Sequence, residues 1–351
     1  MSQDRKPTTW TSVVTVGIFA VATVFGIDRV LCRKYGAEIL SQAEDGLRVL
    51  RATDPVAVVL GSSQARSFET MDQMLAAETG GAVRAPTISI EDGKISSAAW
   101  LFEHRVLPLV RERDASGARV RKHLRHLILI TDWWDSMAPT DGRLRDGRWE
   151  SRNLPARCWS LAHFLDDARA TGLTEFNRLF ISAAWSGLWG DSPLVRDRGY
   201  ALLRRLLREG KVEFSIAQNT VYLESVRKMV EESAPRILAD QEMVALGRIC
   251  ELARDEGLTC TVVLFPALVE TISPVGRKET LDRFAAVAAP LVRARGAAFH
   301  DWSFHTPLET RHFRDQAHLN AAGHRLLSAW ALDGDLAFLR QGRPESRKEP
   351  R

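Results

Sequence analysis

Two short segments near opposite ends of the chain hold the residue types best suited to chemistry. The first, GSSQARSF (61–68), follows the apolar run VAVVL (56–60) and places Ser62 and Ser63 where a strand turns into a helix. A hydroxyl at such a turn lies at the carboxyl edge of a sheet, where open α/β folds bind their ligands. The same serines also suit a plain helix cap. One glycine is too few for a GxxxxGK[ST] phosphate loop.

The second segment, FRDQAHLNAAGH (313–324), supplies an acid and a histidine three residues apart. A serine hydroxyl needs a general base to become a nucleophile, and the base needs a group that orients it. His318 could take the serine proton while Asp315 holds the imidazole from behind. The same spacing also occurs at solvated helix starts, so this segment alone does not decide between the two roles.

A zinc site is the rival use of this region, since zinc binds imidazole and carboxylate ligands. The stretch from 300 to 318 contains four histidines and two aspartates, which are His300, Asp301, His305, His312, Asp315 and His318. It contains no HxH or HxxxH pair, so we expect no metal there and no cofactor elsewhere.

The elements that must position these residues follow from short apolar runs. Five of them predict strands buried on both faces, at 56–60, 87–90, 127–131, 261–265 and, more weakly, 298–301. Helical patterns lie between them, for example at 94–112 and 240–257. The alternation predicts an α/β three-layer sandwich around a parallel five-stranded sheet.

The remaining parts of the chain suggest how the domain is organised. Residues 36–340 are expected to form the α/β domain, opening with an amphipathic connecting helix over 36–54. Residues 141–235, between the third and fourth strands, predict a helical cap over one end of the sheet. Its four tryptophans suit either ordinary core or a substrate wall. The charged, proline-containing tail 341–351 is expected to be disordered.

The N-terminal segment 1–35 predicts a membrane anchor. Thr8 to Ile27 form an uncharged run of 20 residues, which at about 1.5 Å per residue matches a hydrocarbon core of about 30 Å. Trp10 lies where an interfacial aromatic residue belongs. A cleaved signal peptide is the alternative. Basic residues on both sides leave the orientation undetermined by charge.

Composition argues against one class of partner and says little about redox chemistry. The 48 basic and 44 acidic residues give a formal net charge of +4 and are interspersed. No basic stripe is interleaved with aromatic residues, so nucleic acid is not an expected partner. The four cysteines show no CxxC spacing; a Cys250–Cys260 bridge and buried free thiols both fit.

The GSS turn and the DxxH segment together resemble the SGNH (GDSL-like) hydrolase superfamily over about residues 55–335. The resemblance implies an SGNH or flavodoxin-like fold. It also implies Ser63 rather than Ser62 as nucleophile, His318 as base and Asp315 as its orienting acid. The most similar members are membrane-anchored and carry a GSS block, such as D-alanyl-lipoteichoic acid transfer proteins and alginate O-acetyltransferase accessory proteins.

The same superfamily pattern places a glycine after the second strand and an asparagine after the third, where both help to hold an oxyanion. Gly93 suits the first role. The third strand instead runs into TDWWDSM, which offers Asp132 and Trp133. An indole N–H can donate to an oxyanion, whereas a carboxylate cannot unless protonated. Losing one donor costs roughly 10²–10³ in rate in other acyl-transfer enzymes.

Two functional hypotheses follow from the resemblance. The first is a single-pass, membrane-anchored serine esterase or O-acyltransferase in the periplasm or outside the cell. It would act on acylated glycan or lipid-linked esters of the envelope. The second is a catalytically degenerate protein of the same fold that binds glycan or a membrane-bound acyltransferase. The missing asparagine after the third strand favours this second hypothesis, because it removes one expected oxyanion donor.

Overall fold

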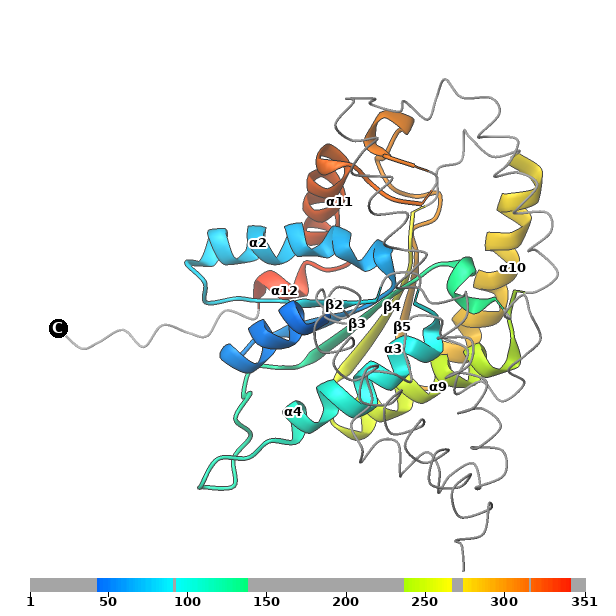
Figure 1. Cartoon of the computed structure of the whole chain (residues 1–351). Helices are drawn as coiled ribbons and strands as arrows, with labels where there is room; N and C mark the ends of the chain where they lie inside the picture. The colour runs from blue at the N-terminus through cyan, green and yellow to red at the C-terminus, as the bar shows by residue number, and fades with distance from the viewer. Residues whose placement is uncertain (1–42, 91–92, 138–236, 267–273, 316, 342–351) are drawn as a thin grey trace, which may run out of the picture. The chain divides into compact units, whose positions relative to one another are not determined.

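The computed structural model describes residues 43–90, 93–137, 237–266, 274–315 and 317–341, which form an α/β fold with a five-stranded parallel sheet (Figure 1). The strands are β1 (Ala57–Gly61), β2 (Thr87–Ser89), β3 (His126–Thr131), β4 (Thr259–Leu264) and β5 (Ala298–Asp301). Their order is β2-β1-β3-β4-β5, and every neighbouring pair is parallel. The predicted α/β class with a parallel five-stranded sheet is thereby confirmed.

The first strand lies between β2 and β3, and its last residue is held closely by both. Gly61 pairs with Ser89 on one side and Ile130 on the other. A Cβ atom at Gly61 would lie 2.5 Å from the Ile130 carbonyl oxygen. Only glycine fits this approach, and the chain leaves the sheet immediately after it, at Ser62.

Helices connect the strands and cover both faces of the sheet (Figure 1). After an opening helix over 43–52 come η1 (Ser63–Arg66), α2 (Ser67–Thr79), α3 (Ile95–Leu101), the π-helical η2 (Phe102–Val106), α4 (Leu107–Arg111) and η3 (Trp133–Ser136). The second half contains α9 (Asp240–Asp255), α10 (Pro274–Arg293), η8 (Thr310–His312), α11 (Ala321–Asp333) and α12 (Phe338–Gln341).

The helix predicted over 94–112 is divided in three. A π-helical segment, η2, separates α3 from α4, and Pro108 stands in the first turn of α4. Proline has no N–H and its ring crowds the carbonyl four residues before it. The regular hydrogen-bond ladder therefore cannot continue through this position, and the wider π turn accommodates the break.

Each face of the sheet has its own hydrophobic core, because side chains alternate along a strand. Val58 and Leu60 of β1 pack in one cluster with residues of α3, α9 and α10. Ala57 and Val59 pack in the other, with residues of α2, α11 and α12. Strands β1 to β4 are thus buried on both faces over most of their length, as their apolar runs predicted. The same expectation is wrong for β5, an edge strand that is exposed at its first residue and buried only at Phe299.

Several predicted features lie outside the described residues. These are the anchor over 8–27, the cap over 141–235 and residues 342–351 of the tail predicted over 341–351. The first residue of that tail, Gln341, is helical and ends α12, so the predicted disorder is wrong there. Within the described ranges, no helix has the length and apolar character needed to cross a membrane. Cys250 and Cys260 are buried free thiols whose sulfur atoms lie 3.8 Å apart.

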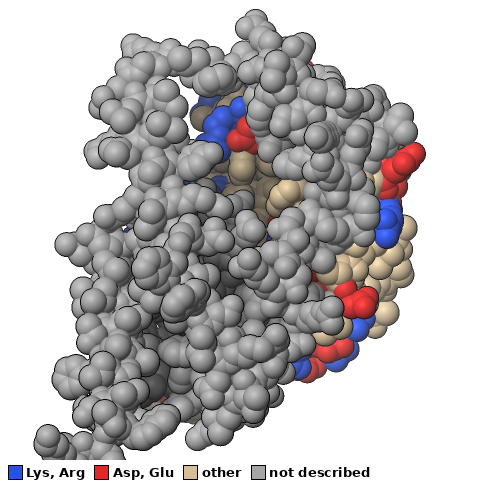
Figure 2. Space-filling model, turned by 45° about the vertical axis from the view of Figure 1, so that its right-hand side comes forward, with Lys and Arg blue, Asp and Glu red and all other residues tan. Residues whose placement is uncertain are grey.

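Charges of both signs adjoin one another on the face seen in Figure 2. Ion pairs join separate helices and loops: Arg111 contacts Glu256 at 2.6 Å and Arg248 contacts Glu103 at 3.3 Å. Exposed pairs of this kind contribute little to stability. The absence of a nucleic-acid partner stays a prediction from composition.

Candidate active site

The serine turn projects its two hydroxyl groups toward different partners. Ser62 is extended and buried, and its carbonyl accepts the N–H of Ala65 at 3.0 Å as η1 begins. Its hydroxyl contacts Gln64 and Asp135. Ser63 is half-buried, and its Oγ lies 2.8 Å from Nε2 of His318. Of the two serines, Ser63 is the one that faces the predicted base.

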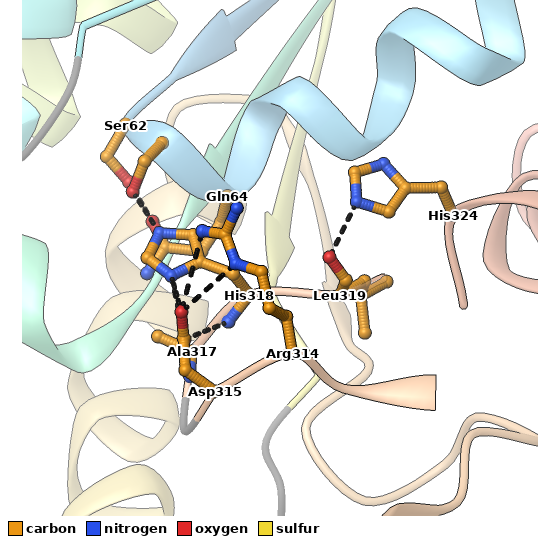
Figure 3. Close-up of polar contacts among 9 residues, drawn as sticks. Ser62, Gln64, Arg314, Asp315, Ala317, His318, Leu319 and His324 are labelled. Atoms are coloured by element: carbon orange, nitrogen blue, oxygen red, sulfur yellow. Dashed lines mark hydrogen bonds and ion pairs between the residues drawn. The ribbon is translucent and has the colours of Figure 1, made fainter. Parts of the chain in front are cut away.

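The acid and the histidine lie on one tightly closed loop. Phe313 and Leu319, both buried, form an antiparallel bridge, and the Arg314 N–H donates to the His318 carbonyl at 2.8 Å. Inside this loop, Nδ1 of His318 lies 2.8 and 3.0 Å from the two carboxylate oxygens of Asp315. The backbone N–H groups of Ala317 and His318 also donate to Asp315 Oδ1 (Figure 3).

The loop is anchored by the start of α11. Asn320 caps this helix: its side-chain oxygen accepts the N–H groups of Ala322 and Gly323 at 3.0 Å, and its amide donates to the Arg311 carbonyl. Gly323 permits a close approach, because a Cβ there would lie 2.2 Å from the His312 carbonyl oxygen. The asparagine and glycine of the FRDQAHLNAAGH segment thus hold the acid–histidine loop in place.

The electrostatics of the pair determine the orientation of the imidazole. Burial opposes ionisation of Asp315, but the hydrogen bond and charge of His318, the Ala317 N–H and the charge of Arg314 outweigh it and lower the pKa of this carboxyl. An ionised carboxylate only accepts hydrogen bonds. In its neutral form the imidazole would therefore carry its proton on Nδ1 and present the lone pair of Nε2 to Ser63.

The three oxyanion candidates have different surroundings. The Gly93 N–H donates to the Ile90 carbonyl at 3.0 Å, so in this arrangement it is already used within its own turn. Asp132 caps η3 by accepting the Trp133 N–H at 2.7 Å. The Trp133 indole is buried, and its Nε1 has no acceptor among the described residues. Only the indole therefore offers an uncommitted side-chain donor.

The sequence did not predict a role for Asp135, which contacts the serine turn from the end of β3. Asp135 lies under Ser62, with its Oδ2 3.2 Å from the serine Oγ and 3.0 Å from the Asp132 N–H. The TDWWDSM segment does contain two acids three residues apart. Nothing in one sequence shows that the end of β3 brings the second acid beneath the end of β1.

The histidines and acids of 300–318 do not gather as metal ligands. Asp335 accepts the Trp302 indole N–H at 2.7 Å and contacts His300 at 3.0 Å, while His312 Nδ1 accepts the Glu309 N–H. Among the described residues, no three His, Cys, Asp or Glu side chains form a group that could hold a metal ion.

Comparisons with known proteins add no relative to this picture. No protein-family model matches the chain, and no curated protein matches it. A function for the chain must therefore be inferred from its residues and their geometry.

Proposed function

We propose that the chain is a serine esterase or O-acyltransferase that works through Ser63, His318 and Asp315. The observation that carries the proposal is the continuous contact from Ser63 Oγ to His318 Nε2 and from His318 Nδ1 to Asp315. A nucleophile within hydrogen-bond reach of a base, itself oriented by an acid, is the arrangement that covalent acyl transfer requires.

The chemistry follows from these contacts. His318 Nε2 takes the Ser63 proton as Oγ bonds to the carbonyl carbon of an ester. The tetrahedral intermediate collapses when the carbon–oxygen bond of the ester breaks, and His318 returns the proton to the leaving alcohol. Water or a second hydroxyl then attacks the acyl-serine by the same route in reverse. Asp315 orients the imidazole and stabilises its charged form throughout.

The oxyanion of the tetrahedral intermediate needs hydrogen-bond donors that point at it. The Ser63 N–H belongs to the first turn of η1, where backbone N–H groups have no intrahelical acceptor. The Trp133 indole is the second candidate, because its Nε1 is buried without an acceptor among the described residues. Gly93 could contribute only by releasing the Ile90 carbonyl.

The resemblance to SGNH hydrolases supports the finer parts of the proposal. The strand order 2-1-3-4-5 is that of flavodoxin-like doubly wound sheets, which bind ligands at the carboxyl ends of the strands. The proposal has three further parts: a helical cap over 141–235, an anchor over 8–27, and an acylated envelope glycan or lipid-linked ester as substrate. These last three rest on sequence pattern and resemblance.

A catalytically degenerate binding protein is the second candidate. Two observations favour it: the third strand leads to Asp132 and Trp133 instead of an asparagine, and the Gly93 N–H is bonded to Ile90. Such a protein would keep the fold and the three site residues but would not activate Ser63.

A fluorophosphonate probe separates the two candidates, because it reacts with an activated serine whatever the natural acyl group. We expect one adduct per chain by intact-mass measurement, mapped to Ser63 by peptide analysis. Ser63→Ala and His318→Ala should each abolish labelling. Ser62→Ala is the matched control and should slow it by no more than about tenfold, or about 1.4 kcal/mol.

Two results would contradict the proposal. Absence of any adduct on folded wild-type protein would favour the binding protein. Labelling that persists in Ser63→Ala and disappears in Ser62→Ala would show that the nucleophile is the other serine.

A further inference from the structure

The hydroxyl of Ser62 makes more contacts than its single proton can serve. Its Oγ lies against Oε1 of Gln64 and 3.2 Å from Oδ2 of Asp135. A serine hydroxyl donates one hydrogen bond, while an amide oxygen and an ionised carboxylate only accept. If Ser62 donates to Gln64, the contact with Asp135 needs a proton that Asp135 itself supplies.

Water has little access to this cluster. Ser62 is 4% exposed, Gln64 6% and Asp135 3%. An unpaired polar atom in such a site is costly, so each donor and acceptor must find its partner among the groups present. Figure 3 shows Ser62 and Gln64 at the start of the turn that leads from β1 into α2, beside the histidine loop.

The charges that act on Asp135 are those of Asp132, at the end of β3, and Lys94, just before α3. Burial raises the pKa of the Asp135 carboxyl well above its ordinary value, and the charge of Asp132 raises it further. The charge of Lys94, the Asp132 N–H and the Ser62 hydroxyl act in the opposite direction and do not cancel this. From α9, the buried Glu242 is held by the Ser96 N–H and hydroxyl.

We propose that Asp135 is a positioning residue that keeps its proton and donates it to Ser62 Oγ, while Ser62 donates to Gln64 Oε1. This chain of hydrogen bonds joins the end of β3 to the turn after β1 and holds Ser63 toward His318. Loss of the proton would leave two adjacent acids both charged, Asp132 and Asp135, and would remove the donor to Ser62. The catalytic consequence rests on the function proposed above.

One alternative satisfies the same count. If the Gln64 amide is turned over, its nitrogen donates to Ser62 and Ser62 donates to an ionised Asp135. That arrangement places a bare carboxylate beside Asp132 in a buried site, which burial and like charge both disfavour. The two arrangements differ in one measurable quantity, the protonation state of Asp135 at neutral pH.

Infrared difference spectroscopy of full-length protein with ¹³C-labelled aspartate carboxyls reads that quantity without any turnover. Subtracting Asp135→Asn from wild type should reveal a protonated carboxyl band at neutral pH that converts to a carboxylate band as pH rises. Asp72→Asn is the matched control: Asp72 is also buried but is ion-paired with Arg84 at 2.6 Å, so its difference spectrum should show a carboxylate.

The fluorophosphonate labelling rate tests the positioning role. In wild type the rate should decline at alkaline pH as Asp135 ionises. Asp135→Asn, whose amide can still donate to Ser62, should label at close to the wild-type rate at neutral pH and should lack this decline. Asp135→Ala removes the donor to Ser62, so it should lose up to about tenfold across the range, as Ser62→Ala does.

The outcomes separate the two proposals. A carboxylate band for Asp135 at neutral pH overturns the inference, as does an alkaline decline that is identical in wild type and Asp135→Asn. A protonated band in a wild-type protein that no probe labels supports the proton assignment and overturns the proposed function.

Discussion

Replacing Gly323 with alanine tests how the fold holds the base against the nucleophile. The added Cβ would lie 2.2 Å from the His312 carbonyl oxygen, whereas ordinary contact begins at 3.4 Å. The start of α11 and the end of η8 must therefore separate by about 1.2 Å, the difference 3.4 − 2.2. Overpacking of this kind costs about 1–3 kcal/mol. At about 2–4 °C per kcal/mol, Tm should fall by about 2–12 °C.

The same displacement reaches the site, because His318 lies between the two elements that move apart. A misplacement of about 1 Å at a reacting group can cost about 10² in rate. We therefore expect Gly323→Ala to slow fluorophosphonate labelling by about 10–100-fold in protein that remains folded. Thermal unfolding followed by circular dichroism and time-resolved labelling measure the two effects separately.

Gly334→Ala is the matched control, at the other end of the same helix. Its φ is −114°, and a Cβ there would lie 3.3 Å from the Trp330 carbonyl oxygen, which needs only a slight adjustment. It should change stability by about 0.5 kcal/mol or less and leave labelling nearly unchanged. If Gly323→Ala melts and labels like Gly334→Ala, the close approach to His312 does not position the loop.

Two further predictions concern the same loop. Asn320→Ala should lower the free energy of unfolding by about 1 kcal/mol in urea titrations, because the Ala322 and Gly323 N–H groups lose their cap. Asn320→Asp should recover most of this loss. Equal losses in both variants would argue against capping. Asp315 has a lowered pKa in the folded protein, so its stabilising contribution is present above the unfolded value of about 3.9 and is lost as pH falls through the lower folded value. The stability difference between wild type and Asp315→Asn should therefore shrink through this acid range, and a constant difference would show that Asp315 titrates alike in both states.

Most of the sheet could be predicted because its strands are continuous β-branched runs. The expected range 298–301 coincides with β5, and the other four ranges differ from β1 to β4 by one or two residues at their ends. Continuous apolar runs also indicate burial on both faces, which fixes the class of fold. The helix predicted over 240–257 agrees with α9, Asp240–Asp255, to within two residues, because its apolar residues recur with helical spacing.

What could not be predicted depends on contacts between distant segments. A single sequence does not show that Ser62 faces Asp135, because this depends on how β1 and β3 end side by side. The contact of Ser63 with His318 is expected only from the SGNH resemblance and not from the residue pattern itself. The engagement of the Gly93 N–H by Ile90 is a local turn with no clear sequence signal. Pro108 does indicate a break in the helix, but the helical pattern on both sides of it favoured one continuous helix over 94–112.

The bridge between Phe313 and Leu319 means that His318 and Asp315 move together as one rigid loop. Since both lie on the loop that this bridge closes, a disturbance of α11 or η8 moves them together and alters mainly one distance, from Ser63 Oγ to His318 Nε2. In variants with a displaced loop, the imidazole of His318 should keep its contact with Asp315 but lie too far from Ser63 Oγ to accept the serine proton. Compensating substitutions that restore such variants should be found where α11 meets its neighbours, and not among the three site residues themselves.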